Sequence, residues 1–172
     1  MALLTRTLRI AAAVLALASC SAAHAERASE TDLKAAYVYN FIVLSTWPAS
    51  TPSPLRFCVA GGQEAAAVFR VLSGKVAGHR TVMVANVPSP DRVHECDVLF
   101  LPPAEAGRLD AWLAAAGKRP TLTISDQLPA PEAMLNLRLS GDRIVFDVNT
   151  RAAAYAGIGL SSQLIKLAAP RQ

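Results

Sequence analysis

The chain has 172 residues, of which 52% are hydrophobic and 17% are charged. This length suits one domain and is short for a two-lobed binding protein, and the apolar content excludes an intrinsically disordered chain. The formal net charge of +4 raises the question of a nucleic-acid partner, which depends on where the basic residues lie.

The first 25 residues have the layout of a secretory signal peptide. Arg6 and Arg9 precede a short apolar run over residues 10–18, and Ala23-His24-Ala25 forms a small-x-small cleavage site. The run is too short to cross a bilayer, which takes about 20 residues, and no later segment of the sequence is long and apolar enough for a membrane helix. We therefore expect cleavage after Ala25, export to an oxidising envelope compartment and no membrane span.

A second way of processing this leader stays open. Leu17-Ala18-Ser19-Cys20 resembles a bacterial lipobox, in which the cysteine is lipidated and becomes the first mature residue. A lipid on Cys20 would anchor the protein to a membrane, facing the periplasm, without spanning it. Both alternatives place the mature chain in an oxidising envelope compartment.

The basic character of the chain belongs largely to the leader. Removing residues 1–25 removes Arg6 and Arg9 and lowers the formal charge to +2. The remaining basic residues are scattered and are not interleaved with aromatic residues, which argues against a nucleic-acid partner.

Two cysteines remain after the leader, Cys58 and Cys96. An even number in an oxidising compartment predicts one disulfide, worth about 4 kcal/mol for a loop of this length; two buried free thiols are the alternative. No CxxC motif occurs, and neither His79 nor His94 stands at ligand spacing from a second donor, so we expect no metal site.

The mature chain opens with a helix that is apolar on almost every side. Ser29 and Asp32 form a capping-box pattern before it, and Trp47-Pro48 ends it. The expected core stripe consists of Leu33, Ala36, Tyr37, Phe41 and Leu44. Since further apolar residues lie off this stripe, the helix is either sandwiched in the core or partly used for a protein contact.

Strands and helices alternate along the rest of the chain. The patterns predict, in chain order, a strand over 55–60, a helix over 63–72, strands over 80–87 and 96–101, a helix over 104–116, a strand over 121–125, a hairpin of 133–139 with 143–148, and a final helix from Asn149 or Thr150 to about residue 169. This order predicts a single α/β domain over residues 26–172, with a layered mixed central sheet flanked by helices and a C-terminal β-hairpin followed by a helix.

No residue pattern indicates catalysis. Gly61-Gly62 stands between a strand and a helix, where a phosphate can bind, but neither GxGxxG nor GxxxxGK[ST] occurs, so a plain tight turn is the better interpretation. Ser125-Asp126 ends a strand without the GxSxG pattern of a nucleophile elbow. We expect a protein that is not an enzyme and has no cofactor; a small-ligand-binding module with its pocket at the Gly61-Gly62 turn is the alternative.

Five collinear segments resemble the YfiR-like family of periplasmic regulatory proteins. They are a K-A-x-x-x-Y-N-F…W-P pattern over 34–48, a cysteine-containing strand over 55–61, a C-D-V-L-F-L run over 96–101, T-L-T-I-S-D over 121–126, and a block from R-I-V-F-D-V-N to L-S-S over 143–162. Together they cover nearly all of residues 30–170 in the order of the family.

The resemblance implies a non-catalytic periplasmic α/β protein, often a homodimer. Such a protein binds the periplasmic sensor part of an inner-membrane diguanylate cyclase and represses it, which lowers cyclic di-GMP and biofilm formation. A histidine kinase or another envelope sensor is the alternative partner. In all of these cases the partner is a membrane protein and not a nucleic acid.

The family's first cysteine pair corresponds to Cys58 and Cys96, and reduction of that bond offers a hypothetical route for redox release of the partner. Some members carry a second pair nearer the C-terminus, but no cysteine follows Cys96 here, which puts in doubt any redox switching that depends on it. Where the family often has Gly-Gly before the hairpin, this chain has residues 128–131 as Leu-Pro-Ala-Pro, a change that can alter partner choice.

We expect the first and last helices to form the partner-binding surface, because the first helix has more apolar surface than one core face needs. The candidate residues are the aromatic Tyr39, Phe41 and Trp47 and the polar Asp147, Asn149, Ser161 and Ser162. The alternative is structural: Phe41 and Trp47 belong to the core, and Asn149 and Ser161 cap helices.

Overall fold

The computed structural model describes residues 30–169. The predicted leader, the lipidation candidate Cys20 and the helix cap Ser29 lie outside the described residues and stay predictions. The chain divides into two units, Met1–Lys34 and Ala35–Gln172. The packing described below is that of the second unit.

The described part opens with a helix over residues 30–43. Its core side differs from the predicted stripe: Leu33 is 46% exposed and Ala36 is exposed, whereas Val38 and Ile42 are buried. The prediction was wrong here because apolar residues occupy almost every position, so the periodicity did not fix which side of the helix faces the sheet.

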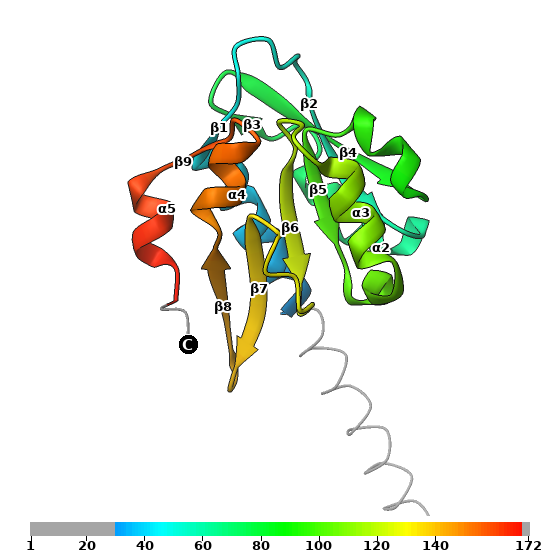
Figure 1. Cartoon of the computed structure of the whole chain (residues 1–172), viewed down its shortest axis with the longest axis vertical. Coiled ribbons are helices and arrows are strands. Elements are labelled where there is room, and N and C mark those ends of the chain that lie inside the picture. The colour runs from blue at the N-terminus through cyan, green and yellow to red at the C-terminus, as the bar shows by residue number, and fades with distance from the viewer. Residues whose placement is uncertain (1–29, 170–172) are drawn as a thin grey trace, which may run out of the picture. The chain divides into compact units, whose positions relative to one another are not determined.

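Among residues 30–169, seven strands form one mixed sheet in the order β3-β4-β2-β5-β6-β7-β8 (Figure 1). Their bounds are β2 Leu55–Ala60, β3 Val76–Ala77, β4 Arg80–Val87, β5 Val98–Leu101, β6 Leu122–Asp126, β7 Leu135–Ser140 and β8 Arg143–Val148. The strands from β4 to β7 are all parallel, while β3 and β8 pair antiparallel at the two edges. The parallel strands have the doubly wound order, with the direction of winding reversed between β2 and β5.

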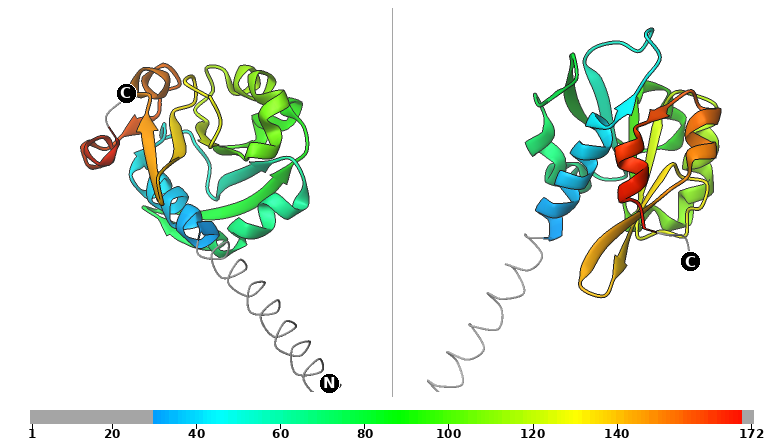
Figure 2. Two further views of the ribbon diagram at one scale, coloured as in Figure 1. Left: turned by 90° about the horizontal axis from the view of Figure 1, so that it is seen from below. Right: turned by 90° about the vertical axis from the view of Figure 1, so that its left-hand side faces the viewer.

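Helices cover both faces of this sheet, which confirms the predicted α/β architecture (Figure 2). On one face the first helix, α2 (Gln63–Ala67) and the 3-10 turn η1 (Val68–Leu72) pack on a core that includes Phe57, Phe69 and Phe100. On the other face, α3 (Leu109–Ala116) packs with Trp112 inward beside η2 (Pro90–Glu95). The side chains of β2 alternate between the two cores, as the pleat requires.

Three predicted helices differ from the structure. The helix expected over 63–72 is α-helical only in α2 and continues as the 3-10 turn η1. The helix expected over 104–116 begins as the 3-10 turn η3 (Pro103–Arg108) and becomes α-helical only in α3. The final helix is broken into α4 (Thr150–Tyr155), the short strand β9 (Gly159–Leu160) and α5 (Ser162–Leu167). Gly157 ends α4 with a positive φ of 71°, a backbone conformation that glycine adopts without strain.

This break lets the C-terminal segment return to the first helix. β9 pairs antiparallel with β1 (Ser45–Thr46), directly after the helix over 30–43. A Cβ atom at Gly159 would lie against the hydroxyl of Thr46, which would have to rotate away, so the two strands approach closely here. The outer edge of β8 is also covered, because Ala169 N donates to Phe146 O at 2.9 Å. The chain therefore brings its first and last helical segments together beside β8 (Figure 1).

Within the described residues, no helix combines the length and the apolar character needed to cross a bilayer.

Candidate partner-binding surfaces

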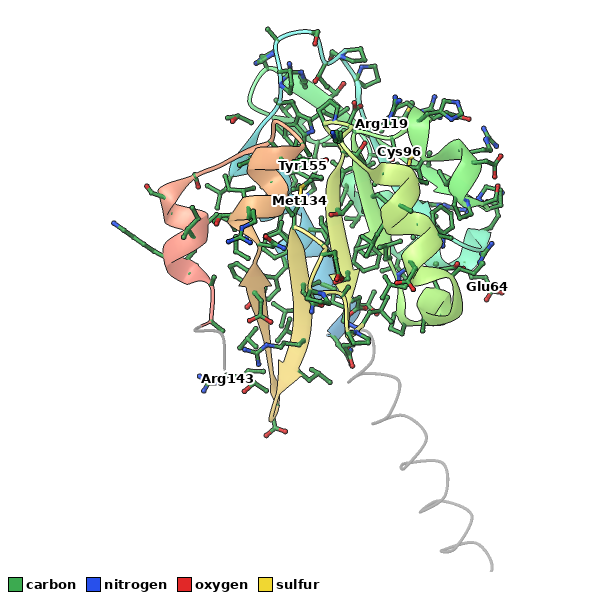
Figure 3. All side chains as sticks on the ribbon, in the orientation of Figure 1. Glu64, Cys96, Arg119, Met134, Arg143 and Tyr155 are labelled. Carbon is green, nitrogen blue, oxygen red and sulfur yellow. A yellow bond between two sulfur atoms is a disulfide. The ribbon has the colours of Figure 1, made fainter. Side chains whose placement is uncertain are left out.

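Cys58 and Cys96 form the predicted disulfide, with a Cα–Cα distance of 5.7 Å. Cys58 lies in β2 and Cys96 lies just before β5, so the bond joins two neighbouring parallel strands (Figure 3). Both side chains are buried in the core under α3, at 0% and 5% exposure. A reductant would therefore reach this bond only when the domain opens locally.

The Gly61-Gly62 turn lies against the side chain of Glu105. A Cβ atom at Gly61 would lie 2.6 Å from Glu105 Oε1, and the φ of Gly61 is 94°. The carboxylate fills the space in front of Gly61, which supports the plain-turn interpretation, whereas the space in front of Gly62 is open. The alternative of a ligand pocket at this turn stays a prediction.

Glu105 is itself a buried and well-paired carboxylate. Trp112 Nε1 donates to Glu105 Oε2 at 2.8 Å, and Arg108 Nη2 lies 2.7 Å from the same oxygen. Burial alone would raise the pKa of Glu105, but the hydrogen bonds from Arg108 and Trp112 and the charge of Arg108 together hold the pKa below its ordinary value. The carboxylate therefore stays ionised and ties η3 to α3.

The strand end at Ser125-Asp126 shows no accessible reactive group. Ser125 and Asp126 are 0% and 4% exposed. The Ser125 hydroxyl donates to Asn136 Oδ1 at 2.8 Å, which joins β6 to β7. Within the described part of the chain, no three His, Cys, Asp or Glu side chains gather as a metal site.

A hollow lies at the amino end of the parallel strands, and we call it the Trp47 groove. Its volume is about 430 Å³, within the range of roughly 300–1,000 Å³ that is typical of binding pockets. Its lining residues are Ile42, Val43, Ser45, Thr46, Trp47, Ala49, Leu55, Ala77, Gly78, His79 and Arg80. Buried aliphatic side chains form its base, while basic side chains from the β3–β4 turn stand at one side.

Trp47 is half-buried at the wall of this groove. Its Nε1 donates to the backbone oxygen of Asp97 at 3.2 Å, which fixes the ring beside the start of β5. Trp47 is thus neither wholly core nor freely exposed, and one part of its ring surface remains available to a binding partner.

Tyr39 lies one helical turn before Val43 and adjoins the groove. The Tyr39 hydroxyl donates to Val76 O at 2.7 Å, and Lys75 Nζ lies 5.1 Å from the ring centroid. Because Ala77 follows Val76 and lines the groove, the two predicted aromatic residues Tyr39 and Trp47 belong to one surface.

Phe41 does not belong to that surface. It is 1% exposed and packs edge-on against Phe146, with ring centroids 4.9 Å apart. The predicted role of Phe41 as an interface anchor is therefore corrected to core packing, because its ring is already covered on the sheet side of the first helix.

The serine candidates lie at the start of α5. The Ser161 hydroxyl accepts from Leu164 N at 3.1 Å as the helix cap, and Ser161 N donates to Leu44 O at 2.9 Å. Ser162 is exposed. A shallow hollow of about 210 Å³ separates α5 from the first helix, with Tyr37, Leu44 and Leu167 among its lining residues. Ser161 therefore has a structural role, which was the stated alternative.

Asp147 and Asn149 lie in a third place, on the sheet face opposite Phe146. They line a hollow of about 270 Å³ beside the Pro129–Pro131 loop. Asn149 caps α4 by accepting from Ala152 N at 2.9 Å, and Asp147 pairs with Arg138 at 2.9 Å. The structure thus separates the polar candidates from Tyr39 and Trp47.

The sequence patterns did not indicate the basic side of the Trp47 groove. His79 lies in the β3–β4 turn and Arg80 begins β4. No local motif indicates them, because their proximity to Trp47 depends on the position of β3 and β4 beside the first helix.

The described residues thus form an α/β domain with hollows at the Trp47 groove, beside the Pro129–Pro131 loop and between α5 and the first helix. The sequence profile of the YfiR/HmsC-like family matches residues 31–169. The chain therefore belongs to the YfiR/HmsC-like family. No curated protein sequence matches the chain.

Proposed function

We propose that this protein is a periplasmic, non-enzymatic regulator that binds the periplasmic sensor part of an inner-membrane diguanylate cyclase and holds the cyclase inactive. The observation that carries the proposal is the family match over residues 31–169, since the family is known for periplasmic regulation of diguanylate cyclases. The buried disulfide supports an oxidising compartment.

Repression would work as a population shift. A binder moves the equilibrium of the sensor only by the difference between its affinities for the inactive and active states. A regulator without a reactive centre can therefore lower cyclic di-GMP inside the cell by preferring the inactive sensor. A chain that bound both states equally would have no effect, however tightly it bound.

Export depends on the leader over residues 1–25, with cleavage after Ala25 or lipidation at Cys20 as the two processing routes. The mass of the N-terminal peptide of the natively exported protein distinguishes them. The homodimer also stays a prediction, and sedimentation of the purified mature chain measures it.

The test of the proposed function is a cross-linked pull-down of the tagged, natively exported protein from whole envelopes. Recovery of a membrane diguanylate cyclase, together with higher cyclic di-GMP when the protein is deleted, is the expected result. Recovery of a histidine kinase or receptor with unchanged cyclic di-GMP would contradict the cyclase assignment.

A further inference from the structure

The apolar surface at the Trp47 groove continues beyond the groove along the first helix. Tyr39 and Val43 stand four residues apart on one face of that helix. Trp47 follows directly after β1 and lines the same groove as Val43. Val43 is 43% exposed, and Val76, which contacts Tyr39, is 57% exposed. We call Tyr39, Val43, Trp47 and Val76 the apolar strip.

Basic groups border this strip, and the groove has no carboxylate in its lining. Arg80 is half-buried, and its Nη2 donates only to a backbone oxygen, that of Thr51, at 3.3 Å. Within residues 30–169, no carboxylate lies within ion-pair distance of Arg80. Lys75 lies over the Tyr39 ring at the other end of the strip, and His79 is exposed beside Arg80.

The carboxyl group that interacts electrostatically with Arg80 belongs to Asp97. Asp97 Oδ2 accepts from Arg56 N at 2.8 Å, so this oxygen is already used within the fold. Burial raises the pKa of Asp97, and the hydrogen bond from Arg56 and the charges of Arg56 and Arg80 counteract part of that rise. Asp97 is not among the residues that line the groove.

We propose that the apolar strip and Arg80 bind an extended segment of the sensor partner that carries an acidic side chain next to a bulky apolar one. The apolar side chain would enter the Trp47 groove over Ile42 and Leu55, and the acidic side chain would pair with Arg80. This inference rests on the proposed function, because the segment belongs to the regulated sensor.

The length of the strip favours a polypeptide segment over a free small molecule. A small carboxylate in the groove would leave Tyr39 and Val76 uncovered, whereas a segment that crosses the groove and runs along the first helix covers both. Tyrosine, tryptophan and arginine are also the residue types that dominate the binding energy of protein interfaces. A charge pair at Arg80 would in addition set the register of the segment.

A site-specific photo-cross-linker tests the position of the segment. It is placed at Ala49, an exposed residue of the groove lining, and at Asp142 at the tip of the β7–β8 hairpin as the matched control. The full chain is exported in its native envelope, irradiated and analysed by mass spectrometry. We expect the Ala49 position to cross-link a sensor peptide with an acidic residue beside a bulky apolar one, and the Asp142 position not to do so.

The outcomes separate this inference from the proposed function. If the sensor co-purifies but cross-links only at Asp142, or at Ala49 through a peptide without an acidic residue, the inference is overturned and the proposed function stands. If no membrane sensor is recovered from any position, the proposed function itself fails, and this inference fails with it.

A charge exchange then tests Arg80. Arg80→Glu should weaken sensor binding at least about tenfold, since loss of a desolvated charge pair acts on the off-rate, and Arg80→Gln should weaken it less. Arg143→Glu is the control, because Arg143 is exposed at the opposite end of the sheet from Cys96 (Figure 3). Exchanging the cross-linked acidic residue of the sensor for lysine should restore binding to the Arg80→Glu protein. Equal affinities of the Arg80→Glu and Arg143→Glu proteins, with native circular dichroism, would overturn the pairing.

Discussion

The two tryptophans of this domain lie at opposite ends of the sheet, each beside an arginine, and they show two uses of the same residue types. Trp112 is 0% exposed, and both it and Arg108 bind the carboxylate of Glu105. Trp47 is half-buried and shares its groove with Arg80, with no carboxylate in the lining.

The two clusters differ in whether a carboxylate of the domain itself pairs with the arginine. At the carboxyl end of the strands, Glu105 satisfies both the indole and the guanidinium, so this cluster contributes to stability and offers nothing to a ligand. At the amino end, Arg80 donates to a backbone oxygen, and no carboxylate of residues 30–169 lies within ion-pair distance of it, although the charge of Asp97 acts on it. An anion from outside the domain would complete this pair. The first cluster should therefore respond to substitution in stability, and the second in binding.

The largest expected effect concerns the α3 face, which contains both Trp112 and the disulfide. Replacing Cys58 and Cys96 together by alanine should lower the free energy of unfolding by about 4 kcal/mol. The measurement is urea denaturation followed by circular dichroism, with the oxidised wild-type protein as reference. A loss below about 1 kcal/mol would show that the bond contributes little to this face.

Glu105→Gln should cost about 1–3 kcal/mol of stability. An amide keeps the shape of the side chain, but it places donor hydrogens toward donors of Arg108 or Trp112 and removes the charge that pairs with Arg108. Glu64→Gln is the matched control, because Glu64 is exposed on α2. Equal stabilities of the two variants in urea denaturation would contradict the role given to Glu105.

The stability that the Glu105 carboxylate contributes depends on pH, and the pKa of this group gives the direction of that dependence. The folded-state pKa of Glu105 lies below its ordinary value of 4.5, so the folded protein favours the ionised form. The stability from this group is complete above the ordinary pKa and disappears as the pH falls through the lower folded-state value. The difference between the wild type and Glu105→Gln should therefore be full at neutral pH and shrink in acid, as measured by urea denaturation across this range. A difference that grows in acid would contradict this assignment.

Asn149→Ala should cost about 1 kcal/mol, the usual cost of losing a helix cap. The side chain accepts from Ala152 N and its amide donates to Pro131 O at 2.7 Å, so it also holds the proline loop. Thermal unfolding measures the loss. If Asn149→Ala left stability unchanged and weakened sensor binding, Asn149 would belong with the partner surface after all.

The smallest effect on stability should come from the apolar strip. Val43→Ser should change the free energy of unfolding by less than about 0.5 kcal/mol, as expected for an exposed site, while it weakens sensor binding. Val71→Ser on η1 is the control, since Val71 is 59% exposed and lies outside the strip. Equal sensor binding by the two variants would remove Val43 from the interface.

Local features of the sequence predicted a large part of this molecule. The strands over 55–60 and 80–87 have the predicted bounds, because a short apolar or alternating run bounded by turn residues encodes a strand locally. The hairpin and the Asn149 cap follow for the same reason. The number of cysteines and the expected compartment were sufficient for the disulfide.

The local sequence pattern predicted one continuous final helix, which the structure does not have. Residues 150–169 carry enough apolar side chains for a continuous helix, but Gly157 and Gly159 let the chain turn back and pair with β1. That pairing is favourable only because the first helix already lies there, and the sequence pattern contains no information on that position. The orientation of the first helix was missed for a related reason, since its apolar residues permit several faces.

The class of fold, a disulfide and the family could be predicted from the sequence, because they depend on local patterns and on segments in a fixed order. Which aromatic residues are accessible depends on packing, which buries Phe41 against Phe146 and leaves Trp47 half-buried. Packing also brings Arg80 beside Trp47 across a sequence separation that no local pattern spans. A binding surface is assembled from residues that become neighbours only when strands and helices pack.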